Sequence, residues 1–135
     1  MNAWGVLPFD NSRAADWVYA LVETSDRSQL ELALGRLKTS DADWFDYGAV
    51  CEALAACEVV ARMSGHGSDA NEFTDLVDHW IARLSIAGDS DLTARAREVV
   101  SQVLDRQLRL RDLSGIITAD AWRAALVALD HRLTT

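Results

Sequence analysis

Residues 46–64 form the segment that most constrains the fold of this chain. After residue 46, the only charged residues in the segment are Glu52, Glu58 and Arg62. A helix that is apolar nearly all round has to be covered on every side, so it belongs at the centre of a bundle. No run in the sequence approaches the roughly 18 consecutive apolar residues that suggest a transmembrane helix. We therefore expect a central helix in a protein without a membrane span.

Five other segments carry apolar residues with the 3.6-residue spacing of an amphipathic helix. These stripes span residues 14–22, 30–37, 73–84, 92–104 and 122–133. The chain has one proline and seven glycines, and no segment alternates polar and apolar residues for long enough to predict a strand. We predict an all-α fold, a single-domain bundle of about six helices over residues 1–135, with an irregular apolar segment at residues 1–9.

Short polar side chains mark the expected starts of the helices, because their oxygens accept hydrogen bonds from the first backbone N–H groups. Asp10, Ser25 and Ser90 are expected to cap the first, second and fifth helices. At the other end of the central helix, Gly65 or Gly67 suits the left-handed backbone position that commonly ends a helix.

The net charge of −8 arises from 21 acidic and 13 basic residues. Phosphate binding requires concentrated Lys and Arg, so this balance argues against a nucleic-acid partner. The charge is uneven, because residues 1–94 hold 16 acidic and 6 basic residues whereas residues 95–135 hold 5 acidic and 7 basic ones. The mildly basic end can pack against carboxylates of its own chain or against those of a second copy, as in a homodimer.

The first ten residues lack the basic start and apolar core of a secretory signal, so we expect a cytoplasmic protein. Cys51 and Cys57 are the two cysteines and lie six residues apart on the expected central helix. At about 100° per residue they point roughly 120° apart and cannot form a disulfide with each other. We expect both to be small core residues rather than metal ligands.

The opening residues AWGVLPFDN, followed by Asp-Trp at residues 16–17, form a distinctive motif. They resemble the start of the bacterial family catalogued as domain of unknown function 4259. Two later stretches are also similar to that family, namely the alanine-rich residues 53–61 with Glu58 at their centre and the last helix at residues 122–133. The resemblance covers essentially the whole chain. It implies a helical fold and carries over no activity.

Asp10, Asn11 and Asp16 lie around the expected start of the first helix. Together they are candidates to bind a cation or a partner. The alternative is that Asp10 caps the helix while Asp16 faces water or pairs with Arg13. The family more often has acidic residues after Asn11, and the arginine found here weakens the hypothesis of a cation site.

Glu58 falls on the same face of the central helix as Leu54 and Cys51. A carboxylate on an apolar face is costly to bury unless it is paired or protonated. One hypothesis makes Glu58 a buried acid that transfers protons or binds a metal. The alternative is a structural anchor, whose carboxylate is satisfied by Arg62 one turn later, by an indole N–H or by the backbone of the N-terminal segment.

Other motifs that would carry chemistry are incomplete. Asp75 and His79 have the i, i+4 spacing of two metal ligands, but the sequence supplies no reliable third ligand. Trp4 and Trp17 either line a ligand pocket or, as is commoner at helical spacing, fill the core. There is no glycine-rich phosphate loop, nucleophile elbow or Cys-x-x-Cys pair. We therefore expect no catalytic residue, no bound metal and no cofactor.

Two functions follow from these observations. The first is a non-catalytic protein-interaction module that binds an unidentified, basic protein, as an immunity-like protein binds a toxin domain. Its acidic charge would speed the encounter with a cationic surface. The alternative is a small metal- or ligand-binding enzyme that uses Glu58 with Asp10 or Asp16, which requires a pocket reaching Glu58. We favour the interaction module.

Overall fold

A computed structural model describes residues 12–35, 47–67, 72–85, 88–106 and 119–134 of the chain. Within these ranges the secondary structure is helical and contains no strand. The helices are α1 (Ser12–Leu21), α2 (Ser28–Gly35), α3 (Tyr47–Met63), α4 (Glu72–Leu84), α5 (Ser90–Arg106) and α6 (Ala119–Thr134). The prediction of an all-α bundle of about six helices is confirmed. None of the described helices has the length and apolar character that crossing a bilayer requires.

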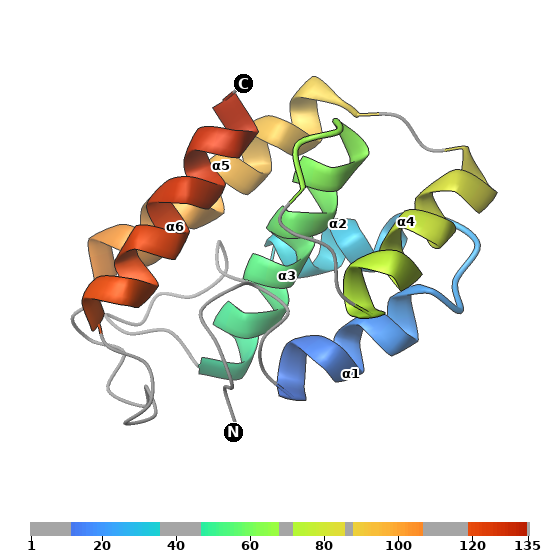
Figure 1. Ribbon diagram of the computed structural model, residues 1–135, viewed down its shortest axis with the longest axis horizontal. Helices are drawn as coiled ribbons and strands as arrows, with labels where there is room; N and C mark the ends of the chain where they lie inside the picture. The colour runs from blue at the N-terminus through green and yellow to red at the C-terminus, as the bar shows by residue number, and fades with distance from the viewer. Residues whose placement is uncertain (1–11, 36–46, 68–71, 86–87, 107–118, 135) are drawn as a thin grey trace.

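Helix α3 lies at the centre of the bundle. It packs against each of the other five described helices, and Figure 1 shows it crossing the middle of the molecule. From Val50 to Ala61, every side chain except that of Glu52 is buried. Several of the completely buried positions hold small residues, which let the neighbouring helices approach closely. These are Ala53, Ala55, Ala56 and Cys57, each fully buried.

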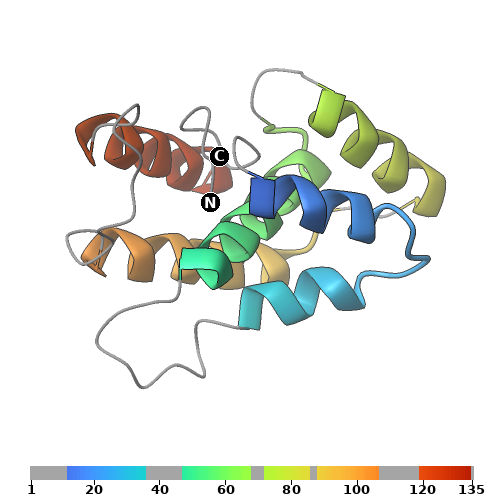
Figure 2. The same ribbon diagram turned by 90° about the horizontal axis from the view of Figure 1, so that it is seen from below.

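The other helices cover α3 from different sides. Helix α5 packs on α6, and α1 packs on α4. Figure 2 places these two pairs on opposite sides of α3, and α2 covers a further side through its contacts with α3 and α5. The apolar stripes expected from the sequence form the core between them. Their most deeply buried members include Leu21, Leu34, Val77, Trp80, Val100 and Leu129.

The start of α5 is capped by Asp89 rather than by Ser90. One carboxylate oxygen of Asp89 accepts hydrogen bonds from the backbone N–H groups of Asp91 (2.7 Å) and Leu92 (3.3 Å). Its other oxygen accepts a hydrogen bond from Arg27 at 3.1 Å, which ties the start of α5 to the start of α2. These backbone hydrogen bonds, together with the one from Arg27, lower the pKa of Asp89.

At the start of α2, the expected capping residue is also replaced by a neighbouring aspartate. Asp26, not Ser25, accepts hydrogen bonds from the backbone N–H (3.0 Å) and the hydroxyl (2.6 Å) of Ser28. Serine and aspartate are adjacent at both helix starts, and both are good capping residues. The carboxylate has the added advantage of a negative charge near the positive end of the helix dipole. The expected cap of α1, Asp10, lies outside the described residues.

The cap at Asp89 predicts a pH-dependent contribution to stability. Because its pKa is lower in the folded chain than the ordinary value of 3.8, the contribution is present above that value and is lost as the pH falls through the folded pKa. At neutral pH, Asp89→Ala should lower the Tm by roughly 3–5 °C, as expected for loss of a helix cap. Asp89→Asn should cost less, because its amide oxygen still accepts the backbone hydrogen bonds.

Thermal unfolding followed by circular dichroism measures both variants of this cap. The difference between the wild-type chain and Asp89→Asn should shrink as the pH is lowered below about 4, since the protonated carboxyl then resembles the amide. A Tm for Asp89→Ala equal to that of the wild type at neutral pH would contradict the assignment of this cap.

Candidate functional site

The carboxylate of Glu58 is buried between α3 and α6. Its side chain has no exposed surface. Arg132 on α6 places one nitrogen, Nη1, 2.9 Å from Oε1 and 3.0 Å from Oε2 of this carboxylate. Arg62, one turn further along α3, lies 3.7 Å away. The negative charge is therefore held by two arginines.

Arg62 extends this contact to α4. Its Nε and Nη2 donate parallel hydrogen bonds to the two oxygens of Asp78, each 2.7 Å long. The hydrogen bonds to Asp78 raise the pKa of Arg62, although its partial burial opposes this. Glu58, Arg62, Asp78 and Arg132, the Glu58 cluster, thus connect α3, α4 and α6 through charged hydrogen bonds.

The end of α3 provides another group for the Glu58 cluster. The backbone N–H of His66 donates to the carbonyl of Ala61 (2.9 Å), and the N–H of Gly65 donates to that of Arg62 (3.0 Å). This pair of bonds defines a Schellman motif, and Gly65 has the positive φ of 82° that the motif requires. The turn directs the carbonyl of His66 toward Arg132, which donates to it at 3.2 Å. Of the two glycines proposed to end this helix, Gly65 does so.

This geometry favours the structural alternative for Glu58. The enzyme hypothesis requires a pocket that reaches the carboxylate, whereas the carboxylate is covered and engaged by arginines. Arg62 was among the partners expected from the sequence, but Arg132 was not. The sequence did indicate that Arg132 lies at the edge of the core, because it follows Leu129 by three residues and is next to Leu133 in the buried stripe of α6.

The acidic residues near the start of α1 do not join the Glu58 cluster in the described structure. Asp16 is exposed on the outer side of α1. The expected pairing of Asp16 with Arg13 is not seen, since Arg13 binds Glu52 of α3 through Nε (2.8 Å) and Nη2 (2.7 Å). Asp10 and Asn11 lie outside the described residues, and Asp16 matches the alternative in which it faces water.

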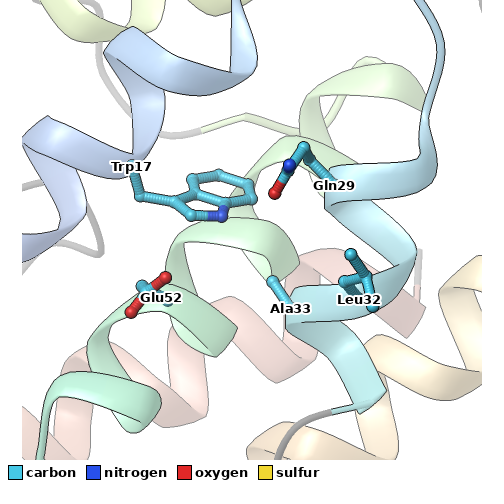
Figure 3. Close-up of a pocket in the computed structure, with 5 residues that line it drawn as sticks. All are labelled: Trp17, Gln29, Leu32, Ala33 and Glu52. Carbon is cyan, nitrogen blue, oxygen red and sulfur yellow. The ribbon is translucent and has the colours of Figure 1, made fainter. Parts of the chain in front are cut away.

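A hollow opens where α1, α2 and α3 meet, as Figure 3 shows. It encloses about 270 Å³ and is lined by Trp17, Gln29, Leu32, Ala33 and Glu52. Trp17 is 7% exposed and belongs to the core. This tryptophan is therefore a core residue that also borders the hollow. Trp4, its suggested companion, lies outside the described residues.

The outer face of α1 and the turn after it display an aromatic ring and two carboxylates. Asp16 and Tyr19 occupy positions i and i+3 of α1, and Glu23 lies in the turn directly after the helix ends at Leu21; all three are exposed. Tyr19 is 50% exposed, and its ring packs edge-on against Phe73 of α4, with centroids 5.7 Å apart. These three residues form the α1 face. The sequence motif pointed to Asp16, but Tyr19 became apparent only from its packing against α4.

Two further expectations concern cysteines and metals. Cys51 and Cys57 are both buried and unbridged, as the helical spacing predicted. Burial strongly raises the pKa of the Cys57 thiol, so the thiolate is disfavoured. Asp75 and His79 are exposed on α4. In the part of the chain that the structure describes, no three histidine, cysteine or acidic side chains come together as a metal site would require.

The basic end of the chain forms several ion pairs with carboxylates of its own chain. Arg95 lies 3.2 Å from Asp91 and Arg97 lies 3.8 Å from Asp130. With the pair between Arg132 and Glu58, these contacts match one of the two arrangements expected from the uneven charge. Pairing with a second copy of the chain stays a prediction.

The fold and its charged centre define a class of protein, a helical-bundle domain whose middle helix carries a buried carboxylate clamped by arginines. The family follows from the sequence itself. This chain belongs to the DUF4259 family, described as a domain of unknown function, whose sequence profile matches residues 2–123. The resemblance seen in the opening motif is therefore confirmed. Searches of curated proteins and of solved structures give no match to the chain.

Proposed function

We propose that this protein is a non-catalytic interaction module that binds a basic protein through the α1 face. The observation that carries the proposal is the environment of Tyr19. Its ring is half exposed yet held in place by Phe73, and two exposed carboxylates, Asp16 on α1 and Glu23 in the turn after it, precede and follow it in the chain. Such a ring is oriented before a partner arrives, so little side-chain freedom is lost on binding.

The chemistry of the α1 face favours a basic partner. Tyrosine is enriched among the residues that anchor protein interfaces, since it offers a large apolar ring and a polar hydroxyl. The flanking carboxylates complement a cationic surface and speed its approach. A basic toxin domain is one partner with this chemistry.

The basic side chains described near the α1 face bind groups of their own chain, and most of their charge is balanced there. In the described residues from 12 to 85 there are four arginines. Three form ion pairs, and the fourth, Arg83, donates to the carbonyls of Val22 and Thr24 at 2.9 and 3.0 Å. The paired arginines are Arg13, Arg27 and Arg62. Arg83 keeps its positive charge beside Glu23, because the carbonyls it binds are neutral, whereas the charges of the other three arginines are balanced by carboxylates.

The proposal predicts that Tyr19→Ala weakens binding of the basic partner by about 10–30-fold, as expected for an interface anchor. The partner is to be captured with the wild-type chain as bait, purified and titrated against each variant by isothermal calorimetry. Asp16→Asn should also weaken binding, with a loss that diminishes at high salt because the charge contributes through screened attraction. Val127→Ala on α6 is the matched control, since Val127 is 49% exposed and lies off the α1 face.

The design separates specific binding from adhesion of charged proteins. A basic protein that binds Tyr19→Ala and Val127→Ala equally well is held by net charge alone and counts against the proposal. If every captured basic protein behaves in this way, the α1 face is not an interface.

A further inference from the structure

The hollow between α1, α2 and α3 lies on the other side of α1 from Tyr19, so one helix contributes to both features. Figure 3 shows the Trp17 indole and the Glu52 carboxylate bordering a space that Ala33 and Leu32 of α2 border from across. Leu32 is 65% exposed although it is a large apolar residue. The wall of the hollow is thus largely apolar, with the Gln29 amide and the Glu52 carboxylate at its edges.

The hollow has room for a single side chain of a partner. Pockets that bind small molecules usually enclose about 300–1,000 Å³. This hollow, at about 270 Å³, lies just below that range. Interfaces commonly use such spaces to receive one anchoring side chain of the partner.

The charge of the hollow indicates which side chain fits. The side chain of Glu52 is only 13% exposed, so its charge acts in a poorly hydrated place. It already accepts a guanidinium, because Nε and Nη2 of Arg13 both lie within 2.8 Å of Oε2. Arg13 itself is 43% exposed and has room to move into solvent.

From these observations we infer that the hollow receives an arginine side chain of the basic partner, an inference that rests on the proposed function. The aliphatic part of this arginine packs against Leu32 and Ala33. Its guanidinium binds Glu52 beside the Trp17 indole, where the aromatic ring adds a cation–π attraction. Arg13 is displaced, so the chain uses its own arginine to occupy the cation position until the partner arrives.

The direct test uses the blocked tripeptide Ala-Arg-Ala as a probe and the indole N–H resonance of Trp17 as the readout, assigned with Trp17→Phe. The tripeptide Ala-citrulline-Ala is the control, because citrulline keeps the shape of arginine without its charge. We expect a saturable shift with the arginine peptide, with a Kd in the millimolar range, and at least fivefold weaker binding of the citrulline peptide. No saturable shift, or equal shifts with both peptides, overturns the inference.

Variants test the role of each group. Arg13→Ala should bind the arginine peptide about two- to threefold more tightly, since no internal guanidinium competes; a purely structural role for Arg13 predicts no gain. Glu52→Gln should abolish the charge preference. Leu32→Ala should weaken binding of the peptide, and its exposure means that the variant retains the fold. Unchanged peptide binding in both Glu52→Gln and Leu32→Ala excludes the hollow as the site.

The same experiments separate this inference from the proposed function. Tyr19→Ala should leave binding of the tripeptide unchanged while it weakens binding of the whole partner. If binding of the partner depends on Tyr19 but the tripeptide does not shift the Trp17 resonance, the hollow is not a binding site, and the proposal that the α1 face is an interface is retained. If the tripeptide binds but no partner's binding depends on Tyr19, the α1 face is not the interface, and the hollow is retained as a site for arginine.

Discussion

Replacing Arg132 by methionine is expected to lower the free energy of unfolding by about 3–5 kcal/mol, the usual cost of breaking a buried ion pair from one side. Methionine retains much of the length of the arginine side chain but leaves the fully buried Glu58 carboxylate with Arg62, which lies at 3.7 Å. Denaturation by urea, followed by circular dichroism, measures the loss.

Two controls show whether this loss comes from the buried charge. Combining Glu58→Gln with Arg132→Met should restore part of the stability, because no isolated charge is then buried. Arg95→Met should change the free energy of unfolding by less than about 0.5 kcal/mol, since Arg95 forms an exposed pair with Asp91. If Arg132→Met costs no more than Arg95→Met, Glu58 is not the anchor described above.

Replacing Trp80 by alanine is expected to destabilise the chain by about 3–5 kcal/mol, the typical cost of removing a large aromatic side chain from a core. Trp80 is 1% exposed, and its indole N–H donates to the carbonyl of Thr24 at 3.1 Å. It therefore fixes α4 both to the core and to the turn after α1. Urea denaturation again gives the measurement.

Trp80→Phe separates the packing of this residue from its hydrogen bond. The phenyl ring fills part of the space, and the carbonyl of Thr24 still accepts a hydrogen bond from Arg83 at 3.0 Å. We expect a loss of only about 1–2 kcal/mol, from the smaller ring and the missing donor. Equal losses in Trp80→Ala and Trp80→Phe would assign the effect to the hydrogen bond and would refute the packing explanation.

The helices and the central position of α3 were predictable because they depend on residues close together in the chain. Apolar spacing sets each buried stripe, and an element that is apolar all round has to lie inside. The burial of Glu58 was predictable because helical spacing places it on the same face as Leu54 and Cys51. The caps were less certain, since Ser25 and Asp26 are equally suitable by type and only the path of the turn selects one.

The arrangement of the candidate sites was not predictable in the same way. Arg132 lies 74 residues from Glu58 in the sequence, and no local pattern relates the two. The hollow is lined by residues of α1, α2 and α3, which come together only in the folded chain. Tyr19 reads as an ordinary exposed residue of an amphipathic helix until its contact with Phe73 is known. These features depend on how helices pack, which one sequence does not specify.

The small buried side chains of α3 also bear on how the chain can evolve. A larger residue at Ala53, Ala55 or Ala56 meets a neighbouring helix at once, so it is acceptable only with a matching reduction on that neighbour. Such paired exchanges are rare, and they slow the divergence of the interior. Asp16 and Glu23 are under no such restriction because they are exposed, whereas Tyr19 is held by its contact with Phe73. Substitutions at such exposed positions can therefore accumulate while the interior stays unchanged.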